Sequence, residues 1–246
     1  MTPSDRTDPP PWFASAPPVR PALTQQQIVE AAHRLVHDGG VEALTLRSLS
    51  GDLGVGTSAI YRRIEGKEHL LVAVADLVLG EVELDGGTSL DWRSSLRSLA
   101  IGVREVLGRH PHIHAVLDSY LLAAPSVAGI ASVAIETLGR SGLPPSEIAD
   151  AYNAWAGYVF GFSMLETLPG PQAKDRELAA SWLRAFMGAI DPDERPTLAA
   201  VSDSVENHAI GMRWEVSPLG PEGGSFVYGL ELVLDGLEAR ASVGSA

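Results

Sequence analysis

The chain has 246 residues, of which 45% are hydrophobic, so it is long and apolar enough to form one large or two modest globular domains. It contains no cysteine, which excludes disulfides, thiol chemistry and thiolate metal sites. It has no charge-free apolar run of roughly eighteen residues and no basic-then-apolar leader. The sequence therefore predicts neither a membrane span nor a signal peptide, and the lack of cysteine suits the cytoplasm.

The net charge of −13 is unevenly distributed along the chain. Residues 24–67 carry five basic and five acidic side chains, whereas residues 68–246 carry 11 basic and 24 acidic ones. The basic residues of the first region cluster toward its C-terminal end. That end can attract phosphate although the whole chain is acidic.

The N-terminal stretch 1–22 is rich in proline and small residues, and we expect it to be a disordered tail. The first predicted helix, Thr24–Asp38, begins with a capping pattern in which Thr24 is followed three residues later by Gln27. The pair Gly39-Gly40 predicts its C-terminal stop.

Two short helices and a tight turn are predicted between Thr45 and Lys67. Thr45 is a favourable N-cap for the first helix, and Gly54 can adopt the left-handed conformation that ends it. The second helix, starting at Thr57 or Ser58, separates its side chains into two sets: Ile60 and Ile64 inside, and Tyr61, Arg62 and Arg63 outside. This pattern predicts a helix-turn-helix, whose second helix offers polar, aromatic and basic side chains to a DNA major groove. The alternative is a pair of surface helices with solvated arginines.

The rest of the chain shows no alternating strand pattern and no internal repeat. The segment Lys67–Glu83 has a wide apolar face, and we expect it to link two domains. The further predicted helices are Ser89–Arg109, His112–Leu122, Ser126–Ser141, Ser146–Leu168, Asp175–Ala189, Pro196–His208 and Glu222–Glu238. We therefore predict an all-α fold, with a three-helix DNA-binding domain at 23–68, a larger helical domain at 69–240 and a flexible C-terminus at 241–246.

Residues 23–82 resemble the DNA-binding domain of the Tet repressor family. The matching features are Ile28, Ala31, Ala32 and Leu35, then Gly39-Gly40-Val41, Leu44-Thr45-Leu46-Arg47, Leu53-Gly54-Val55, Ala59-Ile60-Tyr61-Arg62-Arg63-Ile64, Lys67 and Leu70-Leu71. The second domain resembles that of the tetracycline repressor group in Asp91-Trp92-Arg93-Ser94, Gly142-Leu143 and the segment from Phe226 to Leu237. This resemblance implies a repressor that binds an operator as a homodimer and is released by a small-molecule effector.

For DNA contact, the resemblance and the chemistry of the side chains agree. Arg47 can reach a guanine edge or a phosphate, and Lys67 stands at a helix N-terminus that attracts phosphate. Ala59 offers at most a methyl contact. The candidate DNA-binding residues are Thr45, Arg47, Thr57, Ser58, Ala59, Tyr61, Arg62, Arg63 and Lys67.

For a small-molecule site, the second domain offers large rings with a few polar groups. The candidate ligand-binding residues are Trp92, Tyr120, Asn153, Trp155, Tyr158, Phe162, Glu166 and Trp182, with Met164 and Met187 beside them. The alternative for each is ordinary core filling. Glu166 matches an acidic residue of the tetracycline repressor group, but the histidine through which that group binds a metal–tetracycline chelate falls at Val116.

The resemblance also implies that helices 146–168 and 222–240 form a four-helix dimer interface. The glycines at Gly157, Gly161 and Gly229 would allow close helix approach. The alternatives are a constitutive or activating DNA-binding regulator without a ligand, or a helical enzyme that carries the DNA-binding module. No hydrolase elbow, phosphate-binding glycine loop or HExxH pattern is present, so we predict no enzyme activity.

Three closely spaced histidines, His110, His112 and His114, raise the question of a metal site. Alternate spacing would align them on a strand, but the context is helical and Pro111 separates the first two. We therefore predict no metal site and no cofactor.

Overall fold

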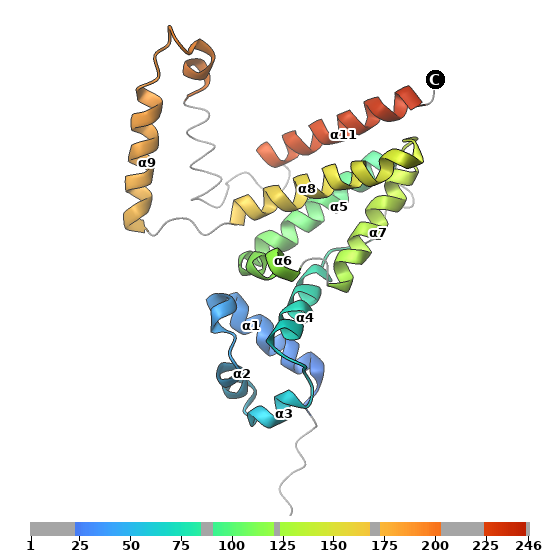
Figure 1. Ribbon diagram of the computed structural model, residues 1–246, viewed down its shortest axis with the longest axis vertical. Helices are drawn as coiled ribbons and strands as arrows, with labels where there is room; N and C mark the ends of the chain where they lie inside the picture. The colour runs from blue at the N-terminus through green and yellow to red at the C-terminus, as the bar shows by residue number, and fades with distance from the viewer. Residues whose placement is uncertain (1–22, 85–90, 121–123, 168–172, 203–223, 245–246) are drawn as a thin grey trace, which may run out of the picture.

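The computed structural model describes residues 23–84, 91–120, 124–167, 173–202 and 224–244 (Figure 1). Within these ranges the chain is helical and contains no strand, which confirms the all-α prediction. The N-terminal stretch 1–22, which we expect to be disordered, lies outside the described residues. None of the described helices is long and apolar enough to cross a membrane.

The DNA-binding domain begins with α1 (Gln25–Ala43), whose N-terminus has the predicted capping box between Thr24 and Gln27. The Gln27 amide donates to Thr24 Oγ1 at 3.2 Å, and the Thr24 amide donates to Gln27 Oε1 at 2.9 Å. A helix end was predicted at Gly39-Gly40. The structure instead has a kink at Gly40, where φ is 71°, and a further helical turn to Ala43.

The predicted helix-turn-helix is present as α2 (Leu46–Leu53) and α3 (Thr57–Tyr61). Thr45 caps α2 through the Ser48 amide at 3.0 Å. Gly54 ends α2 in the left-handed conformation, with φ 62° and ψ 33°, which favours glycine because a Cβ would be strained there. Ile60 and Ile64 are buried, so they fix α3 against the small core behind it.

Helix α4 (Lys67–Leu79) joins the two domains and ends at Gly80, before the predicted Glu83. Its C-terminal part is tied to the second domain through Asp76, whose Oδ1 accepts from the Ser126 amide at 2.6 Å. Ser126 Oγ also donates to the Asp76 carbonyl at 3.0 Å. Asp76 thus satisfies a free amide at the start of α7 (Pro125–Gly139), which has no side-chain cap of its own.

The second domain is a helical bundle. Its described elements are α5 (Trp92–Arg109), η2 (Pro111–Ile113), α6 (His114–Tyr120), α7, η4 (Pro145–Glu147), α8 (Ile148–Thr167), α9 (Ala173–Gly188), a helical stretch at 196–202 and α11 (Ser225–Gly244). Helix α8 packs on α5, α7 and α11, whereas α9 stands away from the bundle (Figure 1). Helix α11 continues to Gly244, so residues 241–244 extend the bundle where we expected a flexible end.

Ion pairs hold α11 against α5. Arg93 donates to three carboxylates of α11: Glu231 at 2.5 Å, Asp235 at 2.6 Å and Glu238 at 3.0 Å. These acidic residues recur at helical spacing and face the same side of α11. Part of the acidic charge of α11 is therefore offset by a basic residue of α5.

Candidate functional site

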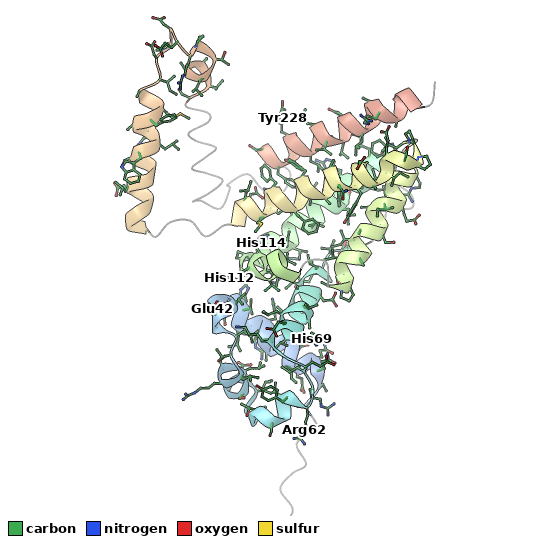
Figure 2. All side chains as sticks on the ribbon, in the orientation of Figure 1. Glu42, Arg62, His69, His112, His114 and Tyr228 are labelled. Carbon is green, nitrogen blue, oxygen red and sulfur yellow. The ribbon has the colours of Figure 1, made fainter. Side chains whose placement is uncertain are left out.

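The outer surface of α2 and α3 presents nearly all the side chains predicted to contact DNA. Ala59 is half-buried, and the other predicted residues are exposed: Thr45, Arg47, Thr57, Ser58, Tyr61, Arg62, Arg63 and Lys67. Tyr61 is 58% exposed although it is aromatic, while its neighbour Ile60 is fully buried. Figure 2 shows Arg62 beside α3, at the end of the molecule away from α11. The helix-turn-helix therefore turns apolar side chains inward and polar or basic ones outward.

The basic side chains of this domain differ in what they already bind. Arg34 donates to Asp52 at 2.7 Å and so joins α1 to α2. Arg62 Nε donates to the Ser58 carbonyl within its own helix at 3.3 Å. Arg47 and Arg63 have no ion-pair partner among the described residues and are the cations most available to an external phosphate or base.

Lys67 has a structural contact that the sequence did not predict. Its Nζ donates to the Val41 carbonyl at 3.2 Å, which closes the loop after the kink in α1. An ammonium has three donors, so this bond leaves two for a phosphate oxygen. The N-cap residue of α4 is Gly66, which has no side chain to accept from the first amides of the helix. No side-chain cap at this helix start is found among the described residues.

Part of the predicted ligand set forms one aromatic cluster at the end of α8. The ring centroids of Tyr158, Phe162 and Phe226 lie 5.5–5.6 Å apart. The Arg104 guanidinium lies 4.7 Å from the centroid of the Phe226 ring, a cation–π geometry. Phe226 was not among the predicted residues, because its helix α11 is distant from α8 in sequence.

Glu166 is held by an ion pair at this cluster. Arg104 donates to both of its carboxylate oxygens at 2.7 Å, and the two side chains are 12% and 18% exposed. The pair is bidentate and largely shielded from water, so it is stronger than a surface ion pair. Glu166 thus already has a partner in this arrangement of the helices.

The Tyr158 hydroxyl is similarly engaged. It donates to the Phe226 carbonyl at 2.7 Å, with the Ser225 carbonyl a second, longer acceptor at 3.2 Å, and so ties the start of α11 to α8. Burial, together with the charge of Glu166, raises the pKa of Tyr158 to about 12. Tyr158 therefore stays a protonated donor at neutral pH.

Two buried nitrogen atoms have no hydrogen-bond partner in the part of the chain that the structure describes. Trp155, which belongs to the predicted ligand set, is fully buried and its indole Nε1 is one of them. The other is Nε2 of His114, which is buried at the start of α6. Burial lowers the pKa of His114 to about 4, so its ring is neutral at physiological pH. A buried polar nitrogen without a hydrogen bond is costly, so each of these two atoms is a candidate for contact with a bound group.

The remaining predicted ligand residues do not join these groups. Trp92 is half-buried, Asn153 is exposed on α8, and Trp182 is 67% exposed on α9, away from the bundle. The side chain of Tyr120 lies outside the described residues. A cavity of about 310 Å³ between the ends of α8 and α11 is lined by Leu143, Glu147, Asp150, Ala151, Ala154, Leu237 and Arg240, none of them in the predicted set.

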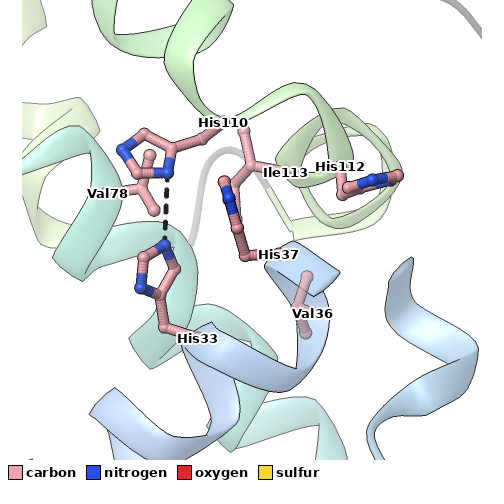
Figure 3. A pocket seen from close by; sticks show the side chains of 7 residues that line it. All are labelled: His33, Val36, His37, Val78, His110, His112 and Ile113. Atoms are coloured by element: carbon pink, nitrogen blue, oxygen red, sulfur yellow. Dashed lines mark hydrogen bonds between the residues drawn. The ribbon is translucent and has the colours of Figure 1, made fainter. Parts of the chain in front are cut away.

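A further cluster was missed because its members lie far apart in sequence. His33 and His37 of α1 converge on His110 at the end of α5 (Figure 3). The three histidines considered from sequence do not behave as a group, since His114 is buried and His112 is exposed. The spacing of four between His33 and His37, which places both on one helix face, was the available signal.

Comparison with known proteins agrees with this geometry. Residues 28–74 match the model of bacterial regulatory proteins of the tetR family. Residues 87–241, more than half of the chain, match the tetracyclin repressor-like C-terminal domain. The chain belongs to the tetR family of bacterial regulatory proteins. It therefore contains a helix-turn-helix DNA-binding domain, and its homologues are transcriptional regulators rather than enzymes.

Individual TetR relatives match over nearly the whole length. The HTH-type transcriptional repressor DrrR1 of Streptomyces coeruleorubidus is 27% identical over 89% of this chain and 78% of its own. The transcriptional regulator SCO7222, a TetR from Streptomyces coelicolor, has 25% identity and a TM-score of 0.70 over 89% of this chain and 99% of its own. ActR from the same organism, in complex with actinorhodin, has 20% identity and a TM-score of 0.72 over 88% and 96% of the two chains, which shows the shared fold.

Proposed function

We propose that this TetR-family protein is a ligand-responsive repressor that binds a near-palindromic operator as a homodimer. The observation that supports this most directly is the exposed α2–α3 surface, where Tyr61 is exposed and Arg47 and Arg63 have no ion-pair partner within the described ranges. DrrR1, a relative along most of the chain, is a repressor.

On DNA, α3 enters the major groove and α2 supports it. Thr57, Ser58 and Tyr61 face base edges and sugar–phosphate, while Arg47 and Arg63 supply the charged contacts. Lys67 and the uncapped start of α4 bind a backbone phosphate and fix the register. One five-residue recognition helix reads few bases, so a second copy about 34 Å away, one turn of DNA, completes the site.

The dimer forms through α8 and α11. Their outward faces carry Gly157 and Gly161 on α8, where an added side chain would meet open space, and Tyr228 and Leu232 on α11, which are 70% and 56% exposed. Small residues opposite exposed apolar ones permit close helix packing between two copies. The exposed Trp182 of α9 is a further apolar group that a second copy would cover.

The effector site lies in the bundle around Trp155, Tyr158 and Phe162. The indole N–H of Trp155, which has no hydrogen-bond partner in the described part of the chain, supports this assignment, since an effector carbonyl or hydroxyl oxygen would satisfy it. ActR, which shares the fold, was solved in complex with actinorhodin. Release from DNA requires that the effector prefer the non-DNA arrangement, by about 10⁴-fold for near-complete switching.

One observation favours a second candidate, a regulator that binds DNA without an effector. Arg104 and Glu166, the charged groups beside the aromatic cluster, pair with each other, so neither charge requires a ligand. The two candidates differ in whether a ligand reaches Trp155. Titration with actinorhodin and related polycyclic aromatics, followed by tryptophan fluorescence in wild type and in a Trp155→Phe variant, separates them.

The DNA function is tested by selection from a random-sequence DNA library with the full-length protein. Enrichment of a near-palindrome with half-sites about one helical turn apart is the expected result. A library that stays random after repeated rounds, with protein that is folded by circular dichroism, would contradict the proposal. The selected sequence then serves as the probe for effector release.

A further inference from the structure

We propose that His33, His37 and His110 form a binding site for one divalent transition-metal ion of the Zn²⁺ type, placed between the DNA-binding domain and the second domain. The coordinating atoms of the three rings all lie within 4.8 Å of one another. Imidazole is a preferred ligand of Zn²⁺, and three histidines with an open fourth position are a common zinc arrangement.

The geometry of two of the ligands already fits an ion. His33 Nε2 and His110 Nδ1 are 3.2 Å apart. Two nitrogens bound to one tetrahedral Zn²⁺ at about 2.0–2.1 Å are separated by about 3.3 Å. His37 is exposed on the next turn of α1, and its coordinating nitrogen lies within 4.8 Å of those of His33 and His110, a gap that rotation about its side-chain bonds can close.

A carboxylate contacts the ring nitrogen of His110 that does not face the proposed ion. Glu81 Oε1 lies 3.1 Å from His110 Nε2, and its other oxygen accepts from Arg109 at 2.9 Å. Donation from His110 Nε2–H to Glu81 leaves Nδ1 with its lone pair directed at His33. This is the carboxylate–histidine–metal arrangement, in which the carboxylate sets the tautomer and strengthens the ligand.

The space between the rings has the size of a single ion. The three histidines line a cavity of about 10 Å³ together with Val36, Val78 and Ile113. That is close to the space one water-sized particle needs. In Figure 3 the rings of His33, His37 and His110 approach one another, while His112 stands to one side on the same cavity wall. Water completes the coordination.

The position of the site gives it a regulatory consequence, which rests on the proposed DNA function. Two ligands belong to α1, and the third follows α5. The residue after His33, Arg34, is bound to Asp52 of α2, so α1 connects the ion directly to the helix-turn-helix. An ion bound here stabilises one arrangement of the two domains. Metal binding therefore changes the affinity for the operator, and operator binding changes the affinity for the metal by the same factor.

The site itself is tested without DNA. Full-length protein made without a histidine tag and stripped with a chelator is titrated with Co²⁺, whose tetrahedral complexes absorb visible light, and with Zn²⁺ in competition. We expect one equivalent to bind per chain. His37→Gln, an exposed position that leaves the fold intact, should weaken binding at least about 100-fold, and Glu81→Gln about 10–100-fold. His69→Gln is the matched control, because His69 is an exposed histidine of α4 paired with Glu65 outside the cluster.

Three results would overturn the site: no saturable binding, an adventitious ion only (weak binding reduced equally by His69→Gln), or wild-type affinity in both His37→Gln and His110→Gln. The coupling is tested on the selected operator with and without Zn²⁺, where a change of at least about 5-fold in wild type and none in His37→Gln is expected. Equal operator affinity with and without Zn²⁺ would refute the coupling. The Co²⁺ titration would still decide whether the metal site exists. A protein that binds Co²⁺ but no DNA would instead overturn the proposed function.

Discussion

Tyr158 and Gly229 lie in direct contact where α8 packs on α11. A Cβ added to Gly229 would lie 2.7 Å from two carbons of the Tyr158 ring, and that ring is fixed by its hydroxyl bond to the Phe226 carbonyl. Gly229 was predicted to allow approach between two copies of the chain. The structure shows that it allows approach of two helices within one copy.

Replacing Gly229 with alanine should therefore destabilise the bundle. The ring cannot move without losing its hydrogen bond, so we expect Gly229→Ala to lower the free energy of unfolding by about 1–3 kcal/mol in urea titration. Gly108→Ala is the matched control, since Gly108 lies in α5 with open space around it. There alanine should stabilise the helix by about 0.5–1 kcal/mol. Equal changes in stability at the two positions would show that the contact with Tyr158 does not exclude a side chain at position 229.

The ion pair between Arg104 and Glu166 should contribute to stability because it is mostly shielded from water. Glu166→Gln removes the charge and leaves the Arg104 guanidinium, 12% exposed, without its bidentate partner. We expect a loss of about 2 kcal/mol, less than for a fully buried pair because both groups retain some solvent. Glu136→Gln, at an exposed position of α7, should change stability by less than about 0.5 kcal/mol. Thermal denaturation of the two variants in parallel measures the difference.

The proposed dimer makes a prediction for the outer face of α8. Gly161 has open space around its Cα, so a large charged side chain fits in one copy but not between two packed copies. Gly161→Arg should convert the dimer to a monomer in analytical ultracentrifugation while the circular dichroism spectrum stays helical. Gly139→Arg, an equally open glycine at the end of α7, should remain dimeric. A Gly161→Arg protein that remains a dimer would place the interface elsewhere.

Burial of His114 predicts how stability depends on pH. Its pKa is about 4 in the folded protein against the ordinary 6.5, so between these values the unfolded chain binds more protons than the folded one. The contribution is fully present above pH 6.5 and declines as the pH falls toward 4, by up to about 3 kcal/mol in total. His114→Gln should flatten this part of the curve of unfolding free energy against pH. An unchanged slope in the variant would show that the pKa of His114 is the same in the folded and unfolded chain.

Local signals were sufficient to predict the helix-turn-helix. The Thr24–Gln27 cap, the Thr45 cap and the left-handed Gly54 depend on residues within one turn, and all three occur as predicted. Helix ends that depend on other elements were predicted less well. Helix α4 stops at Gly80, beside Ser126 of α7: a Cβ at Gly80 would lie 3.5 Å from Ser126 Oγ, and this neighbour cannot be read from the sequence of α4.

The candidate sites also differ in whether their residues are close together or far apart in sequence. Exposure of the DNA-facing residues follows from the spacing within α2 and α3. The aromatic cluster needed Phe226, and the histidine cluster needed His33 beside His110, pairs that only the packing of distant helices brings together. Glu166 was predicted as a ligand-orienting group, and its pairing with Arg104 depends on the contact between α5 and α8.

The central claim, that the α2–α3 surface binds the operator, is tested most directly by the affinity for the selected operator over a salt series. Arg63→Ala, at a cation with no ion pair among the described residues, should weaken binding at least about 10-fold and reduce the salt slope by about one per lost phosphate contact. Arg184→Ala, an exposed arginine of α9, should leave both unchanged. If Arg63→Ala and Arg184→Ala bind with the same affinity and the same salt slope as wild type, the α2–α3 surface is not the DNA-binding surface.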